Sequence, residues 1–410
     1  MNLSGFIARR VAFTKEKSFS RFIIRLATAA TVLSVAVMIV AMAITNGFQY
    51  TISQKIFSFW GHIRVQHYQA GKIAAAEEMA IEKNDTVAQL LRANPQVQSV
   101  NSFATKSAIL KTDETIEGVL LKGVDKNYRF AQLDRFLQQG RWINYPDSGY
   151  SNEIVLSAYT ANQLKLKVNN QVLIYFIQND GSSPRARKLT VTGIYKTGIE
   201  EYDKFISLCD IRLIQRLNNW QPNQIAGYEI FLKDYKQIDQ VNDEIFNSLP
   251  QAWASRTIKE INPNIFDWLN LQDTTIILVL IIMTIVAVLN LITCLIILVL
   301  ERTKMIGILK ALGSPNATIQ KVFLYQGAII TLTGIVLGNV MAFVLCWLQQ
   351  RYGFIHLQEE MYYISKVEIR SEWWHYLLVD AGTFIVCLLI LIIPTLIIRR
   401  VQPVRAIQFR

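Results

Sequence analysis

The sequence predicts a membrane α-helical protein with four transmembrane helices and a large α+β domain of two subdomains inserted between helices 1 and 2. Three observations lead to this prediction. Of the 410 residues, 51% are hydrophobic, which is a high share for a soluble protein. Several long stretches contain no charged residue at all. The basic residues gather in three short segments that flank those stretches.

Four apolar stretches are long enough to cross a membrane as helices. They lie at residues 26–48, 274–300, 322–349 and 375–398, and the only charged residue within them is Asp380. Each exceeds the roughly 20 residues that span about 30 Å of hydrocarbon as a helix. The tripeptide 41–43 resembles a signal-peptidase site, but the charged leader before it is long, so we expect helix 1 to be retained.

The distribution of Lys and Arg predicts the orientation of the chain. The N-terminal segment 1–25, the connection 301–321 and the tail 399–410 carry net charges of +5, +3 and +4, which together exceed the chain's total of +11. Because cytoplasmic segments are enriched in Lys and Arg, we expect both termini in the cytoplasm, and the large domain and the loop 350–374 in the periplasm. Membrane lipids are the expected partners of these charges, and no nucleic acid is expected.

Residues 49–272 are numerous enough to form a hydrophobic core of their own. Their patterning predicts strands at 62–66, 97–110, 115–124, 153–156, 171–178, 188–195 and 228–232, and helices at 77–93, up to 166, and at 236–249. We assign 49–124 with 225–272 to the first subdomain and 125–224 to the second. Cys209 is the only cysteine in this domain, so no disulfide is expected within it.

The connection 301–313 contains a short amphipathic helix. Met305, Ile308, Leu309 and Leu312 recur at helical spacing, which predicts one apolar stripe along the helix. Gly313 is well placed to end the helix. A helix of this kind either lies on the lipid surface or docks into a cytoplasmic protein, and the pattern alone leaves both open.

Residues typical of several enzyme classes are missing from the sequence. It contains no Gly-rich phosphate loop ending in Gly-Lys-Ser/Thr, no G-x-S-x-G motif and no H-E-x-x-H motif. His62 and His67 would lie on opposite faces of a strand, so we expect no metal site there. We therefore expect no catalytic residue, no metal and no directly bound cofactor.

Two features inside the predicted spans are candidates for a role in the membrane. Gly327, Gly334 and Gly338 lie on the third span, where glycines allow the backbones of two helices to approach closely. They serve either packing within the chain or an interface with another subunit. Asp380 is an acidic residue inside the fourth span, close enough to the predicted outer interface to reach water, and we expect a structural role for it.

Further motifs occur in a fixed order along nearly the whole chain, at residues 6–10, 46–49, 61–65, 193–203, 301–313, 326–327, 334 and 403–407. In this order and spacing the sequence resembles the lipoprotein-releasing permeases of the LolC/LolE type, within the wider MacB–FtsX group of ABC transporter membrane subunits. The segment 193–203 is similar to the LolC/LolE branch specifically. The segments 301–313 and 403–407 are shared across the wider group.

The resemblance implies a function in a bacterial inner membrane. A dimer of cytoplasmic ABC ATPase subunits would bind ATP and Mg and contact the helix at 301–313, and the complex would contain a second permease copy or paralogue. It would move lipoprotein substrates from the outer leaflet to a periplasmic lipoprotein carrier. The residues implied in ATPase coupling are Glu301, Arg302, Lys304, Met305, Ile306, Gly307, Ile308, Leu309, Lys310, Leu312 and Gly313.

The resemblance also implies a contact between the carrier and the hairpin loop near 178–188. The candidate residues are Asn179, Asp180, Gly181, Pro184, Arg185 and Arg187. This loop is short and basic rather than an extended apolar hook, and Met305 stands where the wider group often has an acid. An alternative function keeps the same architecture, as a mechanotransmission permease that drives a periplasmic hydrolase or efflux partner. A third possibility is a membrane receptor or scaffold without an ATPase.

Overall fold

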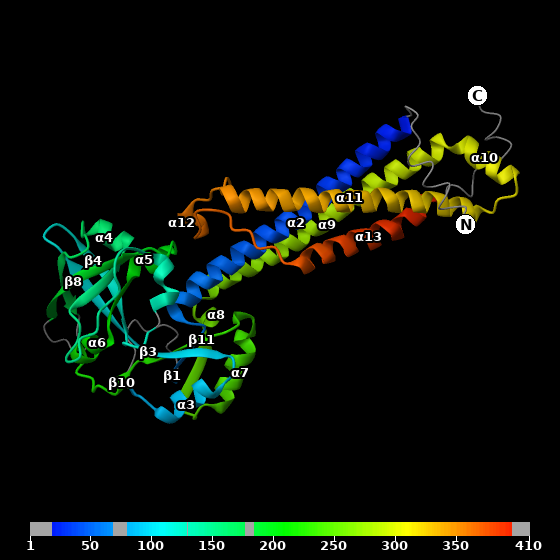
Figure 1. Ribbon diagram of the computed structural model, residues 1–410. Coiled ribbons are helices and arrows are strands. Elements are labelled where there is room, and N and C mark those ends of the chain that lie inside the picture. Colours follow the sequence, from blue (N-terminus) through cyan, green and yellow to red (C-terminus); the bar gives the residue numbers. More distant parts are fainter. Residues whose placement is uncertain (1–18, 69–79, 129, 177–183, 396–410) are drawn as a thin grey trace. The chain divides into compact units, whose positions relative to one another are not determined.

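A computed structural model describes residues 19–68, 80–128, 130–176 and 184–395 (Figure 1). The chain forms two compact units. The helical unit comprises the described parts of Met1–Tyr50, Trp268–His356 and Lys366–Arg410. The insert unit comprises Thr51–Asp267 together with the short segment Leu357–Ser365.

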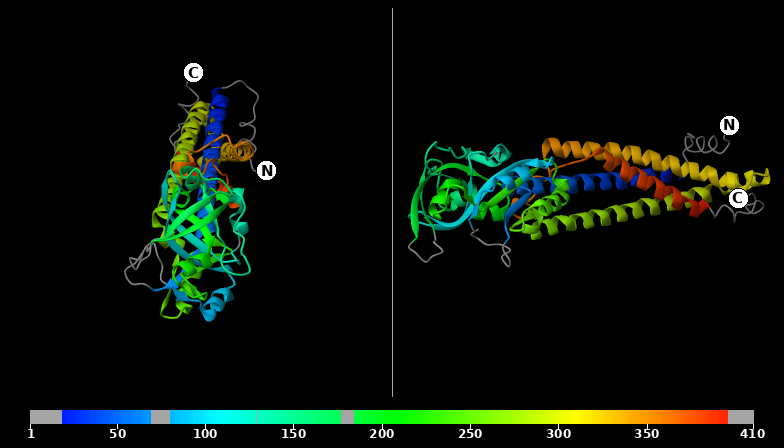
Figure 2. Two further views of the ribbon diagram at one scale, coloured as in Figure 1. Left: turned by 90° about the vertical axis from the view of Figure 1, so that its left-hand side faces the viewer. Right: turned by 90° about the horizontal axis from the view of Figure 1, so that it is seen from below.

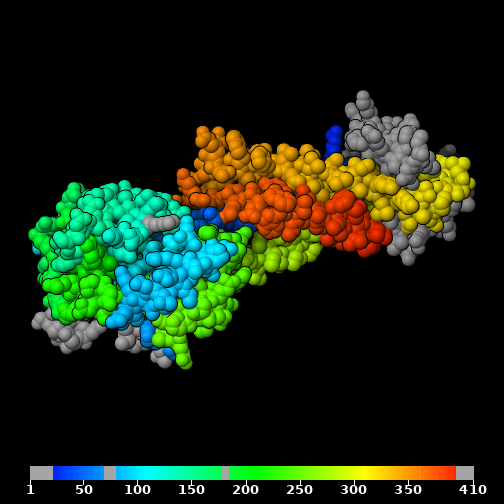
Figure 3. Space-filling view, turned by 60° about the horizontal axis from the view of Figure 1, so that its bottom comes forward, coloured from blue at the N-terminus to red at the C-terminus, as the bar shows by residue number. Residues whose placement is uncertain are grey.

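Four long helices make up most of the helical unit: α2 (Phe19–Trp60), α9 (Pro263–Glu301), α11 (Asn316–Tyr352) and α13 (Trp373–Thr395). Each is long and apolar enough to cross a membrane, which confirms the four predicted apolar helices. They run side by side (Figures 1 and 2). Figure 3 shows α13, in red, lying along α11.

Helices α2, α9 and α11 extend beyond the predicted spans, and α2 and α9 do so by the most. Helix α2 continues past residue 48, where the apolar run ends, and α9 begins at Pro263 rather than at 274. Ile52, Ile56 and Phe59 keep the helical spacing within the polar extension of α2, and all three are buried in the insert unit. Proline is well tolerated at the first helical position, where its missing N–H has no partner to lose.

Side chains from all four long helices form the core of the helical unit. One cluster includes Leu291, Phe323 and Leu391, together with Ala27 from α2. A second cluster is centred on Val35, Met38 and Ile39 of α2, with Ile335 and Val379 from α11 and α13. Large apolar side chains on the outside of the unit remain exposed. Such a surface suits a hydrocarbon environment.

The insert unit is built on one mixed sheet of ten strands among its described residues. The strand order is β12-β1-β11-β3-β4-β9-β6-β8-β5, and β7 pairs with both β3 and β8. The strands are β1 (Ile63–His67), β3 (Val97–Lys111), β4 (Ile116–Val124), β5 (Leu137–Gly140), β6 (Glu153–Ser157), β7 (Gln171–Phe176), β8 (Arg185–Tyr195), β9 (Ile206–Asp210), β11 (Gly227–Leu232) and β12 (Trp253–Thr257). A separate pair joins β2 (Ile81–Glu82) to β10 (Gln224–Ile225).

Short helices connect and cover these strands. They are α3 (Asp85–Ala93), α4 (Ala158–Gln163), α5 (Glu200–Phe205), α6 (Ile211–Leu217), α7 (Ile238–Ser248), α8 (Ile258–Ile261) and α12 (Glu359–Tyr362). Three 3₁₀ turns lie at Phe130–Gln132, Asp134–Phe136 and Tyr235–Gln237. The unit is α+β, as predicted. Its division into two subdomains stays a prediction. The single sheet runs through both predicted parts, since β4 of the first pairs with β9 of the second.

The predicted helix at 77–93 is wrong in its first half as far as the structure describes it. Residues 81–82 form β2, and the helix α3 begins only at Asp85. Asn84 caps it, since its side-chain oxygen accepts a hydrogen bond from the Val87 N–H at 3.1 Å. Asparagine at this position fixes a helix start because it satisfies an N–H that has no partner within the helix. The prediction overlooked that signal.

A buried ion cluster joins the end of α2 to the sheet. The Lys122 ammonium on β4 donates to the carbonyl of Phe59 and to Glu229 Oε2 on β11, the latter at 2.7 Å. Neither charged side chain of the Lys122–Glu229 pair is exposed. Arg64 lies 3.7 Å from Glu229 and stacks over the ring of Trp60. Burial raises the pKa of Glu229, and the two cations oppose that rise.

His62 links the same region to β11. Its ring stacks on Phe57 with ring centroids 4.4 Å apart, and its Nδ1 accepts the N–H of Leu232 at 3.1 Å. Burial lowers the pKa of His62 to about 4, so the ring is neutral at physiological pH and can act as this acceptor. His67, at the other end of β1, is exposed. The two histidines therefore do not form a common site.

Candidate functional site

The short helix α10 (Thr303–Ala311) connects α9 to α11. Gly313 ends it in a left-handed conformation, with φ of +84°. The Gly313 N–H donates to the carbonyl of Lys310, and the Ser314 N–H donates to that of Leu309. This is the Schellman arrangement, which satisfies the last carbonyl groups of a helix and requires a residue that tolerates positive φ.

The predicted apolar stripe of α10 is divided between two faces. On the inner face Ile306 is fully buried, and Met305 and Leu309 pack beside it against the helical core cluster. The outer face carries Lys304, Ile308, Ala311 and Leu312, all exposed. Ile308 is 53% exposed and Leu312 is 78% exposed. The four stripe residues therefore do not all lie on the free face, because Met305 and Leu309 pack α10 against its own bundle.

The remaining predicted coupling residues lie in α10 or directly before it. Glu301 is the exposed last residue of α9, and Arg302 is half-buried at the joint between α9 and α10. Gly307 is buried on the inner side. Lys310 is half-buried, and the loss of water around it lowers its pKa. The outer face of α10 thus presents two large apolar side chains beside one exposed Lys.

The three glycines of α11 pack against helices of the same chain. A methyl group on each would meet a neighbouring side chain: Gly327 faces Leu391 of α13, while Gly334 and Gly338 face Thr31 and Val35 of α2. At Gly334 and Gly338 the missing side chain lets the backbones of α2 and α11 approach closely, as small residues do in membrane helices. Of the two uses that the sequence allowed, this geometry corresponds to packing within the chain.

Asp380 is partly buried between two helices. Asn339 of α11 donates to Asp380 Oδ2 of α13 at 2.8 Å. The second oxygen of Asp380 and the Asn339 oxygen have no hydrogen-bond partner among the described residues. A hydrogen bond between polar side chains inside a membrane fastens two helices together. The geometry suits the structural role that we expected for Asp380.

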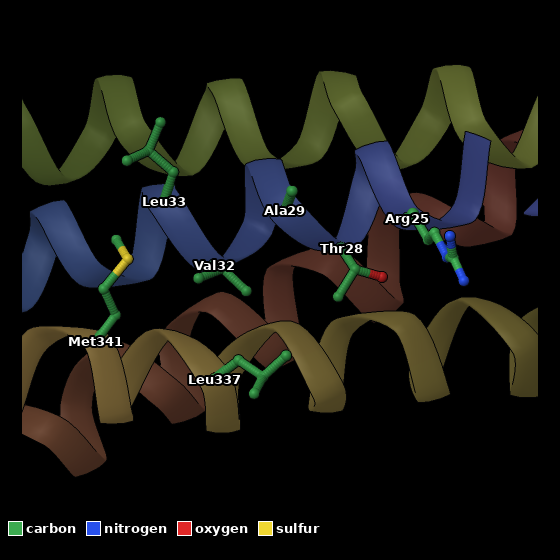
Figure 4. Close-up of a pocket in the computed structure, with 7 residues that line it drawn as sticks. All are labelled: Arg25, Thr28, Ala29, Val32, Leu33, Leu337 and Met341. Carbon is green, nitrogen blue, oxygen red and sulfur yellow. The ribbon is translucent and has the colours of Figure 1, made fainter. Parts of the chain in front are cut away.

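An open apolar groove lies between α2 and α11, with a volume of about 600 Å³. Its lining residues are Arg25, Thr28, Ala29, Val32, Leu33, Leu337 and Met341 (Figure 4). Arg25 lies at one end, while Leu33 and Met341 lie toward the other. An apolar groove with a guanidinium at one end suits the acyl chain of a lipid that has an anionic head group. No sequence pattern pointed to this groove, because its residues come from two distant helices.

The predicted carrier loop lies partly outside the described residues, since Asn179, Asp180 and Gly181 are not among them. Pro184 is exposed. Arg185 donates to the carbonyl of Leu217 at 2.8 Å, so its guanidinium is engaged by the end of α6 rather than being freely presented. Arg187 is half-buried. Contact between Arg185 and the carrier stays a prediction, with the Arg185 guanidinium already bonded to the end of α6.

One face of the sheet beside that loop is poorly covered. Leu173 and Tyr175 of β7 point to this face, next to Lys188 of β8 in the strand register. Ile116 of β4 lies on the same face, because both Ile116 and Leu173 pair with Lys111 of β3. Ile116 is 62% exposed and Leu173 is 37% exposed. Exposed apolar side chains gathered on a sheet face make a candidate surface for another protein.

No group of three or more His, Cys, Asp or Glu side chains in the described part of the chain is arranged to hold a metal ion. The cysteines at 209, 294, 346 and 387 are all buried and unbridged. What the chain offers is packing surfaces: the outer face of α10, the groove along α2 and the open sheet face.

Four long apolar helices and a large α+β domain define the architecture of a multi-pass membrane protein with a large domain outside the bilayer. The sequence matches the family model of the MacB-like periplasmic core domain over residues 26–247. It also matches the FtsX-like permease C-terminal model over residues 277–403. The first match covers more than half of the chain. The chain therefore belongs to this family, and its membership in the MacB–FtsX group is confirmed.

Several curated relatives resemble the whole chain. It is 24% identical to the lipoprotein-releasing system transmembrane protein LolE of Haemophilus influenzae, with all of both chains covered. It is 21% identical to LolC of Xylella fastidiosa over 96% of both chains, and 24% identical to LolC of Neisseria meningitidis over 89% of both chains. Among solved structures, the periplasmic region of MacB from Actinobacillus actinomycetemcomitans matches half of this chain and 91% of its own, at 14% identity and a TM-score of 0.36.

Gly338→Ala is expected to destabilise the helical unit. The new methyl group would lie 2.9 Å from the Val35 side chain and 3.0 Å from the Val32 carbonyl oxygen, so α2 would have to shift. Such overpacking costs about 1–3 kcal/mol. The measurement is the thermal unfolding midpoint of the full chain in detergent. Gly382→Ala on α13 is the matched control, because nothing lies within 4 Å of its new methyl group. Equal midpoints for the two variants would contradict the packing assignment.

Proposed function

We propose that this chain is the permease subunit of an ABC-type complex that extracts lipoproteins from the outer leaflet of the bacterial inner membrane. The observation that carries the proposal is the end-to-end similarity to LolE, whose name describes a lipoprotein-releasing system. The similarity includes both the membrane helices and the insert unit, so it does not rest on the family's common core alone. Both termini would lie in the cytoplasm and the insert unit in the periplasm, as the excess of Lys and Arg favours.

The outer face of α10 is the proposed contact with the ATPase. ATP and Mg would be bound by the partner ATPase dimer. Exposed Ile308 and Leu312 would insert into an apolar groove of the ATPase, with Lys304 at the rim. The buried Ile306 on the opposite side would pass the movement of α10 to the core of the bundle. Because α2 already covers Gly334 and Gly338, a second permease copy or paralogue would use another surface.

The open face of β7, β8, β3 and β4 is the proposed contact with the periplasmic carrier. Two of its strands, β7 and β8, flank in sequence the segment 177–183, which the resemblance implies in carrier binding. Ile116, Leu173 and Tyr175 supply apolar area, and Lys188 supplies charge at its edge. Interfaces commonly combine an apolar centre with a polar rim. Arg185, which is engaged by α6, would support the loop rather than contact the carrier.

An alternative function uses the same parts for another purpose. In that case movement of the helices would drive a periplasmic hydrolase or an efflux partner instead of releasing a lipoprotein. The matches to the MacB-like and FtsX-like family models favour the shared mechanics without specifying the cargo. The fate of lipoproteins separates the two functions.

Depletion of this chain is expected to strand mature lipoproteins in the inner membrane, because their extraction would stop. Membranes fractionated on a density gradient and probed for lipoproteins make the measurement. Re-expression of the unsubstituted chain should restore delivery to the outer membrane. Normal delivery during depletion would favour the alternative function.

Leu312→Asp together with Ile308→Asp should abolish copurification of the ATPase, because two charges would have to be buried in an apolar groove. The measurement is the amount of ATPase that remains bound to the affinity-purified chain. Asn316→Asp adds a charge to the neighbouring exposed first turn of α11 and is the control that should retain the ATPase. If the double variant also retains it, the outer face of α10 is not the contact.

Leu173→Glu is expected to reduce cross-linking of the carrier to the insert unit several-fold while leaving the ATPase bound. The added charge would be buried in the apolar centre of the proposed interface. Photo-cross-linking from Tyr175 in intact cells provides the measurement. Phe246→Glu changes another exposed apolar residue, on α7, and should have no effect. Equal loss in both variants would argue against a specific surface.

A further inference from the structure

The loop between α11 and α13 belongs to two units at once. Its central segment, Leu357–Ser365, is part of the insert unit, although the residues on both sides belong to the helical unit. We call this segment the strap. The Leu357 N–H donates to the carbonyl of Ser365 at 3.1 Å, so the strap is closed on itself where it begins and ends.

Within the helical unit, one buried side chain bonds both arms of this loop to α11. Gln349 near the end of α11 is 3% exposed. Its amide nitrogen donates to the carbonyls of Val367 at 3.0 Å and Ile355 at 3.3 Å, and its oxygen accepts the Ile355 N–H at 3.0 Å. Both arms of the loop are therefore held to α11. Movement of that helix end would carry both arms, and the strap between them, with it.

Polar contacts with Lys196, Glu201 and Lys55 hold the strap to the rest of the insert unit. Glu359 pairs with Lys196 at the end of β8, with 2.5 Å between Nζ and Oε2. The Tyr363 hydroxyl donates to Glu201 Oε1 on α5 at 3.1 Å. The Tyr363 carbonyl accepts from the Lys55 ammonium at 2.6 Å. Tyr363 has φ of +60°, a conformation that a bulky residue holds only when its surroundings impose it.

The motif at 193–203 builds the socket for these contacts. The buried carboxylate of Asp203 accepts the N–H and hydroxyl of Thr197 and the N–H of Gly198, all between 2.8 and 2.9 Å. This fixes the loop between β8 and α5. Gly198 has φ of +75°, and a side chain there would collide with the Glu359 carboxylate. The positive φ favours glycine, and a Cβ there would also displace the Glu359 carboxylate. The motif is thus shaped to receive the strap.

We propose that the strap is a second coupling element, through which movement of α11 and α13 reaches the insert unit in addition to the connections through α2 and α9. The inference rests on the proposed function, because it concerns how that complex transmits movement. The strap stays bound to the insert unit throughout the cycle, and Glu359 and Tyr363 are its positioning residues.

The first test asks whether the contact persists in the working protein. Lys196→Cys and Glu359→Cys are combined in the full chain, in membrane vesicles that contain the assembled complex. A short bis-thiol reagent should link the two cysteines with and without ATP, and mass spectrometry identifies the linked peptides. The four native cysteines are buried, so they give little background. Linkage that disappears when ATP is added would overturn a permanently bound strap.

The second test asks whether the contact transmits movement. The double variant Glu359→Gln with Tyr363→Phe removes two side-chain contacts and keeps both shapes. Assembly and ATP hydrolysis should be unchanged, while lipoprotein released per ATP should fall several-fold. In the cysteine pair, the short cross-link should restore release. Glu114→Gln removes an exposed ion pair with Lys165 elsewhere on the insert unit and is the control that should not lower release. Unchanged release in the double variant would overturn the inference.

A third measurement separates the strap from the proposed cargo. Hydrogen exchange in α6, away from the strap contacts, is compared with and without a non-hydrolysable ATP analogue. The double variant should lose the nucleotide response that the unsubstituted complex shows, whatever the cargo is. An identical response in both would overturn the strap. If the unsubstituted complex hydrolyses ATP without releasing lipoproteins, the proposed function fails and the exchange result alone decides the inference.

Discussion

The junction between α2 and the sheet depends on the buried ammonium of Lys122. A helix that ends inside a folded domain leaves carbonyl groups without intrahelical partners. Here Lys122 satisfies one of them, at Phe59, and its charge is balanced by Glu229 on another strand. One cation thus ties a helix end to two strands of the insert unit. Removing one partner of such a buried pair typically costs about 3–5 kcal/mol, since the other charge is left uncompensated.

Within the helical unit, close packing replaces the hydrophobic effect. Lipid is as apolar as leucine, so helices in a bilayer associate through backbone approach and polar contacts. Gly334 and Gly338 allow close backbone approach between α2 and α11. The hydrogen bond from Asn339 to Asp380 is a polar contact between α11 and α13. With α10 anchored on this bundle through Ile306, force applied at its exposed face would act on packed helices rather than on a loose loop.

The sequence predicted the features that depend on local chemistry. Lipid demands an apolar side chain on nearly every side of a spanning helix, and the four helices followed from that demand. Periodicity could not show which face of α10 is covered, because the buried residues, Ile306 and Gly307, lie outside the predicted stripe. The engagement of Arg185 by α6 and the strap contacts join residues far apart in the chain. They involve single polar side chains, which carry no periodic signal.

The strap limits how the large domain can be exchanged between related proteins during evolution. The insert unit is not one continuous stretch of sequence, since it also includes Leu357–Ser365 from between α11 and α13. A chimera that exchanged only the residues between α2 and α9 would combine a socket from one parent with a strap from another. Lineages that diversify the large domain must therefore change a distant, short loop in step with it. Exchange by recombination is constrained at two places in the gene rather than one.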